Sequence, residues 1–280
     1  MRRFAFVFLV ATFALATPAL PQDSPVTPRP VLIQGALQLE TTRLVGNLKD
    51  AKIERVGVWT FWRGTVDSYP VIVSRTRMGA SHAAAATALA IERYRPIAIV
   101  NQGTAGGHDP ALRVYDIVLG TSAVNLGVFK TPHRAAGMGS TTLDWVPLDL
   151  MESDGGPDDD LHEHRIARFE GDTSLLAAAR RVKHQYARGR VVEGVIGTSD
   201  VWNEEIDRIA RLRASYGTSV EEMETAAAAQ IAGLFNVSFL GIRVVSANIT
   251  SGGAYDPKTG EACQDYVFKV VRAYVANIKH

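Results

Sequence analysis

Short apolar runs alternate along the chain with segments whose apolar residues recur at helical spacing. Several runs are wholly or mostly apolar, which is typical of strands buried on both faces of a sheet. They cover residues 31–36, 97–100, 191–198 and 237–245, with a further strand expected over 114–121. Residues 52–59, 64–66 and 69–77 are rich in β-branched residues and predict hairpin-forming strands.

Helical periodicity fills the segments between these strands. It predicts helices over residues 37–48, 83–93, 173–188, 204–216 and 263–278, together with an alanine-rich helix that follows Glu224. Strands that alternate with helices in this way predict an α/β fold with three layers, α/β/α, around a central mixed, mostly parallel sheet. The region 125–168 breaks the pattern with Gly, Pro and acidic residues and predicts a long irregular excursion.

The first thirty residues differ in pattern from the rest. Met1-Arg2-Arg3 is followed by an apolar run over 4–16 and by small residues as far as Ala19. This predicts a signal peptide over residues 1–19, because the run is shorter than the roughly 20 residues that span a bilayer. A Pro-rich tether over 20–30 and a single domain over 31–280 follow. We therefore expect an exported protein, periplasmic or secreted, with no membrane attachment after cleavage.

Composition narrows the classes of partner. The chain has 280 residues, 46% of them hydrophobic, and a formal net charge of +1, which gives no electrostatic footprint for nucleic acid or an anionic membrane. Cys263 is the only cysteine, so no intramolecular disulfide is expected. The histidines show no metal-ligand spacing; His162 and His164 flank Glu163 in an acidic loop and are interpreted as solvated. We expect no metal and no cofactor.

The stretch around Glu222-Met223-Glu224 has two interpretations. Carboxylates are favoured at a helix N-terminus, and an alanine-rich run begins here, so the charges have a purely structural explanation. Alternatively, a carboxylate in this position accepts two hydrogen bonds from a vicinal diol while the methionine lies against a sugar or a base. The choice depends on which other residues reach the same place.

Ligands of open α/β sheets lie beyond the carboxyl ends of the strands. A glycine-rich turn, Asn101-Gln102-Gly103-Thr104-Ala105-Gly106-Gly107, follows a predicted strand and would let backbone N–H groups approach a ligand. It carries neither the P-loop lysine nor the spaced dinucleotide pattern. Taken alone, a tight connection without a ligand explains it equally well. The expected strand ends lie at residues 35–40, 101–107, 199–203, 222–224 and 246–248.

Together these segments resemble the nucleoside phosphorylase and nucleosidase superfamily, and most closely its 5'-methylthioadenosine/S-adenosylhomocysteine nucleosidases. The resemblance runs from about residue 31 to the C-terminus. Its motifs occur in the family's order: Gly35-Ala36-Leu37-Gln38-Leu39-Glu40, the glycine-rich turn, Ser199-Asp200-Val201-Trp202, Glu222-Met223-Glu224 and Ile242-Arg243-Val244-Val245-Ser246.

The resemblance implies roles for single residues. Glu224 matches the carboxylate that binds the ribose diol, Met223 the residue that packs on the sugar, and Trp202 the aromatic that stacks on the base. Glu40 matches the carboxylate that activates the attacking water. The remaining residues of the implied substrate site are Thr104, Ala105, Gly106, Glu222 and Ser246.

One position departs from the family pattern. The nucleosidases place an Asp after the equivalent of Ser246, where it acts as the acid toward purine N7, but this chain has Ala247 followed by Asn248. Some purine phosphorylases of the superfamily use Asn there, so Asn248 is the candidate for contacting the base. An amide donates a hydrogen bond but supplies no proton as a general acid.

The resemblance therefore implies an exported purine nucleosidase that hydrolyses the N-glycosidic bond of adenosine-type nucleosides, of the methylthioadenosine or S-adenosylhomocysteine kind, to base and ribose derivative. Asn101 stands where many phosphorolytic relatives have a phosphate-binding Arg, although Arg43 and Arg77 lie near enough in sequence to leave phosphate open. The alternatives are a purine nucleoside phosphorylase and a non-catalytic nucleoside-binding protein. Relatives form dimers, so we expect a homodimer or larger homo-oligomer in which residues 129–160 close the neighbour's site.

Overall fold

The computed structural model describes residues 28–148 and 168–278. The strands of its main sheet are β1 (Val31–Gly35), β2 (Lys49–Val56), β3 (Trp59–Val66), β4 (Tyr69–Arg75), β5 (Ala98–Gly107), β6 (Ile117–Asn125), β9 (Arg168–Glu170), β10 (Val191–Thr198), β11 (Thr218–Glu222) and β12 (Ser238–Ala247). The helices are α1 (Thr42–Gly46), α2 (Ala80–Tyr94), α3 (Thr173–Val182), α4 (Ile206–Tyr216), α5 (Thr225–Leu234) and α6 (Thr259–Ile278). Short 3₁₀ turns lie at Gln38–Glu40, Thr142–Asp144, Lys183–Gln185 and Ile249–Ser251.

The main sheet is mixed, as predicted. Its strand order is β11-β10-β6-β12-β5-β1-β4-β3-β2, with β9 paired to β6. The segments β4-β1-β5-β12 and β6-β10-β11 are parallel, whereas β2, β3 and β4 form an antiparallel meander at one edge. Strand β11 also pairs antiparallel with the end of β5, so this end of the sheet folds back on its centre.

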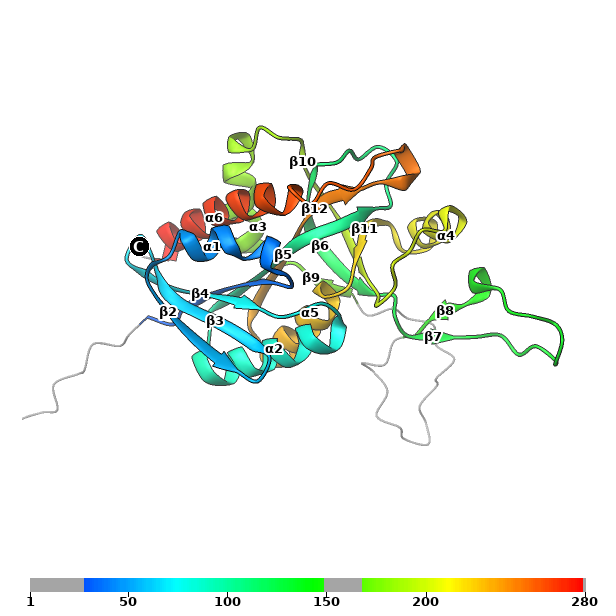
Figure 1. Cartoon of the computed structure of the whole chain (residues 1–280), viewed down its shortest axis with the longest axis horizontal. Helices are drawn as coiled ribbons and strands as arrows, with labels where there is room; N and C mark the ends of the chain where they lie inside the picture. Colours follow the sequence, from blue (N-terminus) through cyan, green and yellow to red (C-terminus); the bar gives the residue numbers. More distant parts are fainter. Residues whose placement is uncertain (1–27, 149–167, 279–280) are drawn as a thin grey trace, which may run out of the picture.

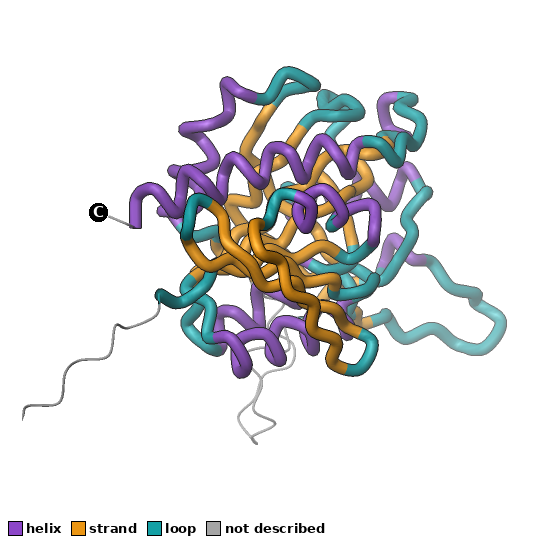
Figure 2. Tube along the Cα trace, turned by 60° about the vertical axis from the view of Figure 1, so that its left-hand side comes forward, coloured by secondary structure: helices purple, strands orange, loops and turns teal. Residues whose placement is uncertain are grey.

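Helices cover both faces of the sheet and complete the three layers (Figures 1 and 2). On one face α1, α3 and α6 pack on the strands in the larger apolar core, which includes Leu44, Leu175 and Val267. On the other face α2 and α5 enclose a second core with Ile99 and Ala228. The continuously apolar strands that the sequence shows are therefore buried from two sides, which is the physical reason for their composition.

Two local predictions are corrected by the structure. The glycine-rich segment 101–107 is the second half of strand β5 and is not a turn. A Cβ at Gly103 would lie 2.7 Å from Glu40 Oε1, so this glycine permits a close side-chain approach to the strand. The helix predicted over 37–48 is a 3₁₀ turn followed by the short α1.

The region before α5 also differs from the prediction. Glu222 ends strand β11, and Glu224 occupies the N-cap position of α5, so the three-residue motif connects a strand to a helix. The sequence predicted only the helix. The strand was missed because Thr218-Ser219-Val220-Glu221-Glu222 is a short run in which polar residues flank a single apolar one.

Several predicted segments fall partly or wholly outside the described residues. The signal peptide over 1–19, most of the tether over 20–30, and the acidic loop around His162 and His164 are among them. Part of the predicted partner-closing segment is described: β7 (Phe129–Lys130) and β8 (Val146–Pro147) form a hairpin that projects from the body (Figure 1). Its role between subunits stays a prediction. Within the described ranges, no helix has the length and apolarity needed to cross a membrane, and no cluster of His, Cys, Asp and Glu is arranged to hold a metal ion.

Candidate active site

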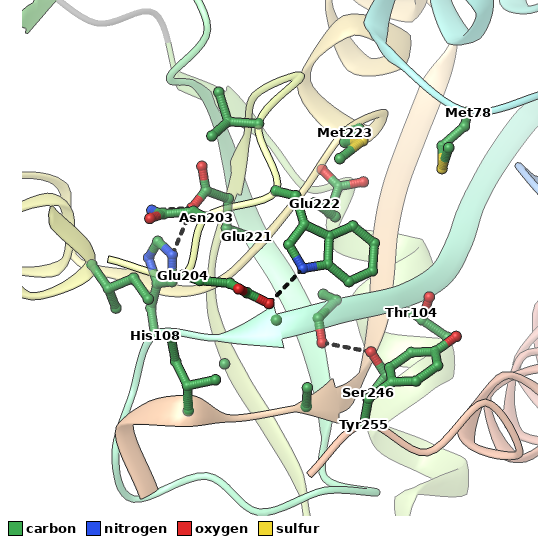
Figure 3. Close-up of a pocket in the computed structure, with 18 of the residues that line it drawn as sticks. Met78, Thr104, His108, Asn203, Glu204, Glu221, Glu222, Met223, Ser246 and Tyr255 are labelled. Atoms are coloured by element: carbon green, nitrogen blue, oxygen red, sulfur yellow. Dashed lines mark hydrogen bonds and ion pairs between the residues drawn. The ribbon is translucent and has the colours of Figure 1, made fainter. Parts of the chain in front are cut away.

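A cavity of about 300 Å³ lies where the carboxyl ends of β1, β5, β10, β11 and β12 converge. This is the position that the strand-end argument predicts. Most of the predicted residues line it: Glu40, Thr104, Ala105, Gly106, Trp202, Glu222, Met223, Glu224 and Ser246. Segments far apart in the sequence therefore supply one site (Figure 3).

Glu40 lies at one end of the cavity, and its carboxylate is held by four hydrogen bonds. Oε2 accepts the backbone N–H groups of Ala36 at 2.9 Å and Leu37 at 3.1 Å, and Oε1 accepts the Thr104 N–H at 2.8 Å and hydroxyl at 3.0 Å. Only 4% of the residue is exposed. The Thr104 hydroxyl is the one donor free to rotate, so a water molecule can replace it on Glu40.

Glu224 faces the same end of the cavity from the start of α5. Its Oε1 accepts the Gly79 N–H at 2.8 Å, and its Oε2 lies 3.9 Å from Arg243 Nη2. Burial and the neighbouring charge of Glu222 raise the pKa of Glu224 to about 8, against the opposing pull of Arg243. Glu224 thus has one oxygen that a ligand hydroxyl can reach and a proton affinity that depends on what binds beside it.

Glu222 borders the cavity, but its carboxylate is committed to the protein. Arg243 Nε donates to Oε2 at 3.0 Å, and the N–H groups of Glu224 and Thr225 donate to the same carboxylate at 3.0 Å. Arg243 is 1% exposed and also donates to Asn101 Oδ1 at 2.5 Å. These contacts make Glu222 a support for Arg243 and the α5 N-terminus, while its predicted role as a substrate ligand stays a prediction.

Trp202 lies on the loop that follows β10 and covers the cavity mouth. It is 70% exposed, and its indole N–H donates to Glu204 at 3.1 Å. Met78 and Met223 also line the cavity with their thioether side chains (Figure 3). An exposed indole together with two flexible apolar side chains is suited to hold a flat aromatic ligand.

Asn248 does not contact the cavity, although Ser246 and Ala247 do. Its Nδ2 donates to the carbonyl oxygens of Asp109 at 2.9 Å and Leu112 at 3.0 Å, and its Oδ1 accepts the Thr250 hydroxyl at 2.6 Å. The side chain is fully satisfied and 1% exposed. The prediction that Asn248 contacts the base is therefore wrong in this conformation, because the amide anchors the loop after β5.

The sequence did not identify a second polar cluster in the cavity wall. His108 Nε2 lies 2.8 Å from Glu221 Oε2, and its Nδ1 lies 2.8 Å from Thr218 Oγ1. Asn203 Nδ2 donates to Glu221 at 2.9 Å, and the Ser199 hydroxyl donates to the same carboxylate. His108 follows the glycine-rich segment directly and Glu221 precedes the Glu-Met-Glu motif, so adjacency to two motifs was the signal available in the sequence.

Acidic side chains dominate the charged lining of the cavity. Five glutamates line it: Glu40, Glu204, Glu221, Glu222 and Glu224. Among the described residues, no Lys or Arg lines it. The two arginines left open by the sequence lie elsewhere: Arg43 pairs with Asp265 at 2.8 Å, and Arg77 donates to the Val58 carbonyl at 3.4 Å. The cavity therefore offers acceptors to hydroxyl and N–H groups and no cation to an anion.

Comparisons with known proteins agree with this geometry. A family model described as the phosphorylase superfamily matches residues 30–276. The 5'-methylthioadenosine/S-adenosylhomocysteine nucleosidases of Bacillus cytotoxicus and Tolumonas auensis are 28% and 29% identical, over 77% and 82% of this chain and 84% and 89% of their own. The solved structure of such a nucleosidase from Colwellia psychrerythraea, in complex with adenine, superposes with a TM-score of 0.69 at 26% identity, over 88% of this chain and 95% of that one.

Proposed function

Because the chain belongs to the phosphorylase superfamily, we propose that it is a nucleosidase that hydrolyses the N-glycosidic bond of adenosine-type purine nucleosides. The observation that carries the proposal is the cavity itself, which joins Glu40 and Glu224 at one end to Trp202 at the other without a Lys or Arg among the described residues. The names of the similar nucleosidases support methylthioadenosine or S-adenosylhomocysteine as the substrate type.

The reaction depends on positioning the water and the sugar and on stabilising the positive charge of the sugar, more than on a covalent bond between the protein and the substrate. Glu224 accepts hydrogen bonds from the ribose diol, and Met223 packs against the sugar. Glu40 takes a proton from water as the water oxygen bonds to the anomeric carbon. The carbon–nitrogen bond breaks with its electron pair passing to the purine, and the purine anion then takes a proton from solvent. Both carboxylates stabilise the positive charge that develops on the sugar in the transition state.

The leaving base is the weak point of this mechanism. The Ala247 side chain has no acidic group that could protonate the base, and Asn248 points into the loop after β5. Loss of a general acid lowers the rate by roughly 10²–10⁴-fold. We therefore expect turnover that is slow for an enzyme of this kind.

Water rather than phosphate is the expected nucleophile. A phosphate dianion would face glutamates and no Lys or Arg among the described residues of the cavity. The test is to incubate the purified protein with methylthioadenosine, adenosine and inosine in phosphate-free buffer and to follow base release by chromatography. Release that requires added phosphate and yields ribose 1-phosphate would replace this proposal with a phosphorylase.

A second candidate function, nucleoside binding without turnover, is favoured by the same absence of an acid at Ala247. Calorimetry would then show saturable binding of nucleosides with no base released over a day. The variant Ala247→Asp distinguishes the two: a gain of turnover in a protein that otherwise only binds would identify the missing acid as the cause. A variant Ala135→Asp, which adds a carboxylate at an exposed position outside the cavity lining, serves as the control.

We further propose an exported location, on the basis of the signal-peptide pattern over residues 1–19. Salvage of extracellular nucleosides would suit that location. Cell fractionation with an antibody against the protein, and N-terminal sequencing of the mature form, test it; an intact Met1 in the cytoplasmic fraction would refute it.

A further inference from the structure

We propose that Glu221 determines the base specificity of the cavity by accepting an N–H hydrogen bond from the base. The inference rests on the proposed function in taking the ligand to be a nucleoside. Its chemical requirement is a base with a donor on the edge that meets Glu221: the amino group of a 6-aminopurine or the N1–H of a 6-oxopurine.

Glu221 is a buried carboxylate that can accept one more hydrogen bond. It is 7% exposed and lines the cavity from strand β11. Among the described residues, three protein groups donate to it: the Ser199 hydroxyl, His108 Nε2 and Asn203 Nδ2. A carboxylate has about four acceptor positions, so one remains for a donor in the cavity.

The three donors also keep Glu221 an acceptor. Burial opposes ionisation, but the hydrogen bond and charge of His108, with the bonds from Ser199 and Asn203, lower the pKa of the Glu221 carboxyl below its usual range. A carboxylate that carries no proton can only accept. A base edge with nothing but lone pairs would therefore leave Glu221 facing another acceptor.

His108 is a positioning residue for this carboxylate. Both of its ring nitrogens have protein partners, Thr218 and Glu221, so neither nitrogen is available to hydrogen-bond a ligand. It lies immediately after β5 and is 2% exposed. Its place on the strand that also carries Thr104 and Gly106 fixes Glu221 relative to the sugar end of the cavity.

The strand register brings Glu221 within reach of a base. Gly106 pairs with Glu221 on one side and with Ala247 on the other, so three neighbouring strands share this part of the cavity floor. A Cβ at Gly106 would meet only the Glu221 carbonyl oxygen at 3.9 Å, which leaves the floor open. Figure 3 shows His108, Glu221 and Asn203 on one side of the cavity and Met78 and Thr104 on the other. A nucleoside with its sugar at Thr104 would direct its base toward Glu221.

Direct binding tests the inference without turnover. In the Glu40→Gln background, calorimetry compares adenosine, inosine and purine riboside, whose base carries no N–H group. A hydrogen bond to a charged acceptor is worth about 1.5–3 kcal/mol, so we expect adenosine or inosine to bind roughly 10- to 100-fold more tightly than purine riboside. The order of adenosine and inosine identifies which donor Glu221 accepts. Equal affinity of all three nucleosides would overturn the proposal.

Variants assign the preference to Glu221. Glu221→Gln should bring the three affinities within about threefold of one another, and Glu204→Gln, which removes another carboxylate from the same cavity, should leave the preference intact. His108→Leu should weaken the preference, and His108→Gln, whose amide can still donate, should restore part of it. A preference that survives Glu221→Gln, or that disappears in Glu204→Gln, contradicts the assignment.

The two proposals fail separately. If the unsubstituted protein releases no base but prefers adenosine or inosine over purine riboside, the hydrolytic function is wrong and the role of Glu221 stands. If hydrolysis occurs at equal kcat/KM for all three nucleosides, the hydrolytic function stands and Glu221 is not the specificity residue.

Discussion

Glu224 should make the stability of the ligand-free protein depend on pH. Its carboxyl is buried beside Glu222, and its pKa is raised from 4.5 to about 8. The native state therefore binds this proton more tightly than the unfolded chain does. The contribution of Glu224 to stability is fully present below about pH 4.5 and is lost as the pH rises toward about 8.

The rise in the pKa of Glu224 sets the size of the pH-dependent change in unfolding free energy. One pKa unit corresponds to about 1.36 kcal/mol, so the rise to about 8 corresponds to at most about 5 kcal/mol. The cavity admits water, and Arg243 lies 3.9 Å from Glu224 Oε2, so screening reduces this value. We expect the difference in unfolding free energy between the unsubstituted protein and Glu224→Gln to fall by about 1–3 kcal/mol between about pH 5 and pH 8.5.

Urea unfolding of both proteins, followed by fluorescence across that pH range, measures the difference. Comparing the two proteins cancels the titration of groups that do not interact with Glu224. Glu204→Gln is the matched control, because this glutamate lines the same cavity from an exposed loop. A pH-independent difference between the unsubstituted protein and Glu224→Gln would show that the pKa of Glu224 is not raised and would refute the reasoning.

The raised pKa of Glu224 also bears on ligand binding. Nucleosides should bind more tightly as the pH rises toward about 8, since the diol needs the ionised carboxylate.

Three further substitutions test separate parts of the site. Glu40→Gln should lower kcat roughly 10²–10⁴-fold in a base-release assay while the nucleoside Kd changes little, and an unchanged kcat would remove Glu40 from the chemistry. Trp202→Ala should raise KM roughly 5- to 100-fold through loss of about 1–3 kcal/mol of stacking, with no change in the urea midpoint because the indole is exposed. Arg243→Met leaves Glu222 buried without its partner and should cost about 3–5 kcal/mol in urea unfolding. Arg43→Met, at an exposed ion pair, should cost less than about 1 kcal/mol; equal losses for the two arginines would contradict this assignment.

The sequence predicted the fold class because the central strands contain long apolar runs and the helices between them are periodic. It also predicted where the site would lie, because the strand ends carry Glu40, Thr104, Trp202 and Glu224. Strand β11 was missed because it is short and Val220 is its one apolar residue. The division of labour among carboxylates was missed for a different reason: whether a glutamate faces a ligand or a buried arginine depends on partners remote in sequence, such as Arg243 for Glu222.

The role of Asn248 shows the same limit. Its position after Ser246 suggested contact with a ligand, but a Cβ at Gly107 would lie 2.5 Å from the Asn248 side chain, so that side chain packs beside the glycine-rich strand. Its amide then binds the loop that starts at His108. A residue close after a ligand-binding residue in the sequence can point away from the ligand. The path of the loop determines in which direction its side chain points.

The register of β11 has a consequence for how this protein can diverge. Glu221 and Glu222 are adjacent on one strand, so their side chains leave it in opposite directions, one toward the ligand space and one toward Arg243. The strand begins directly after Gly217, which ends α4 with a φ of +72°. A one-residue shift of the strand at this junction would turn Glu221 to the face that meets Arg243 and Glu222 to the opposite face. The length of the α4–β11 connection therefore influences which ligand the site selects, in addition to the side chains that touch the ligand.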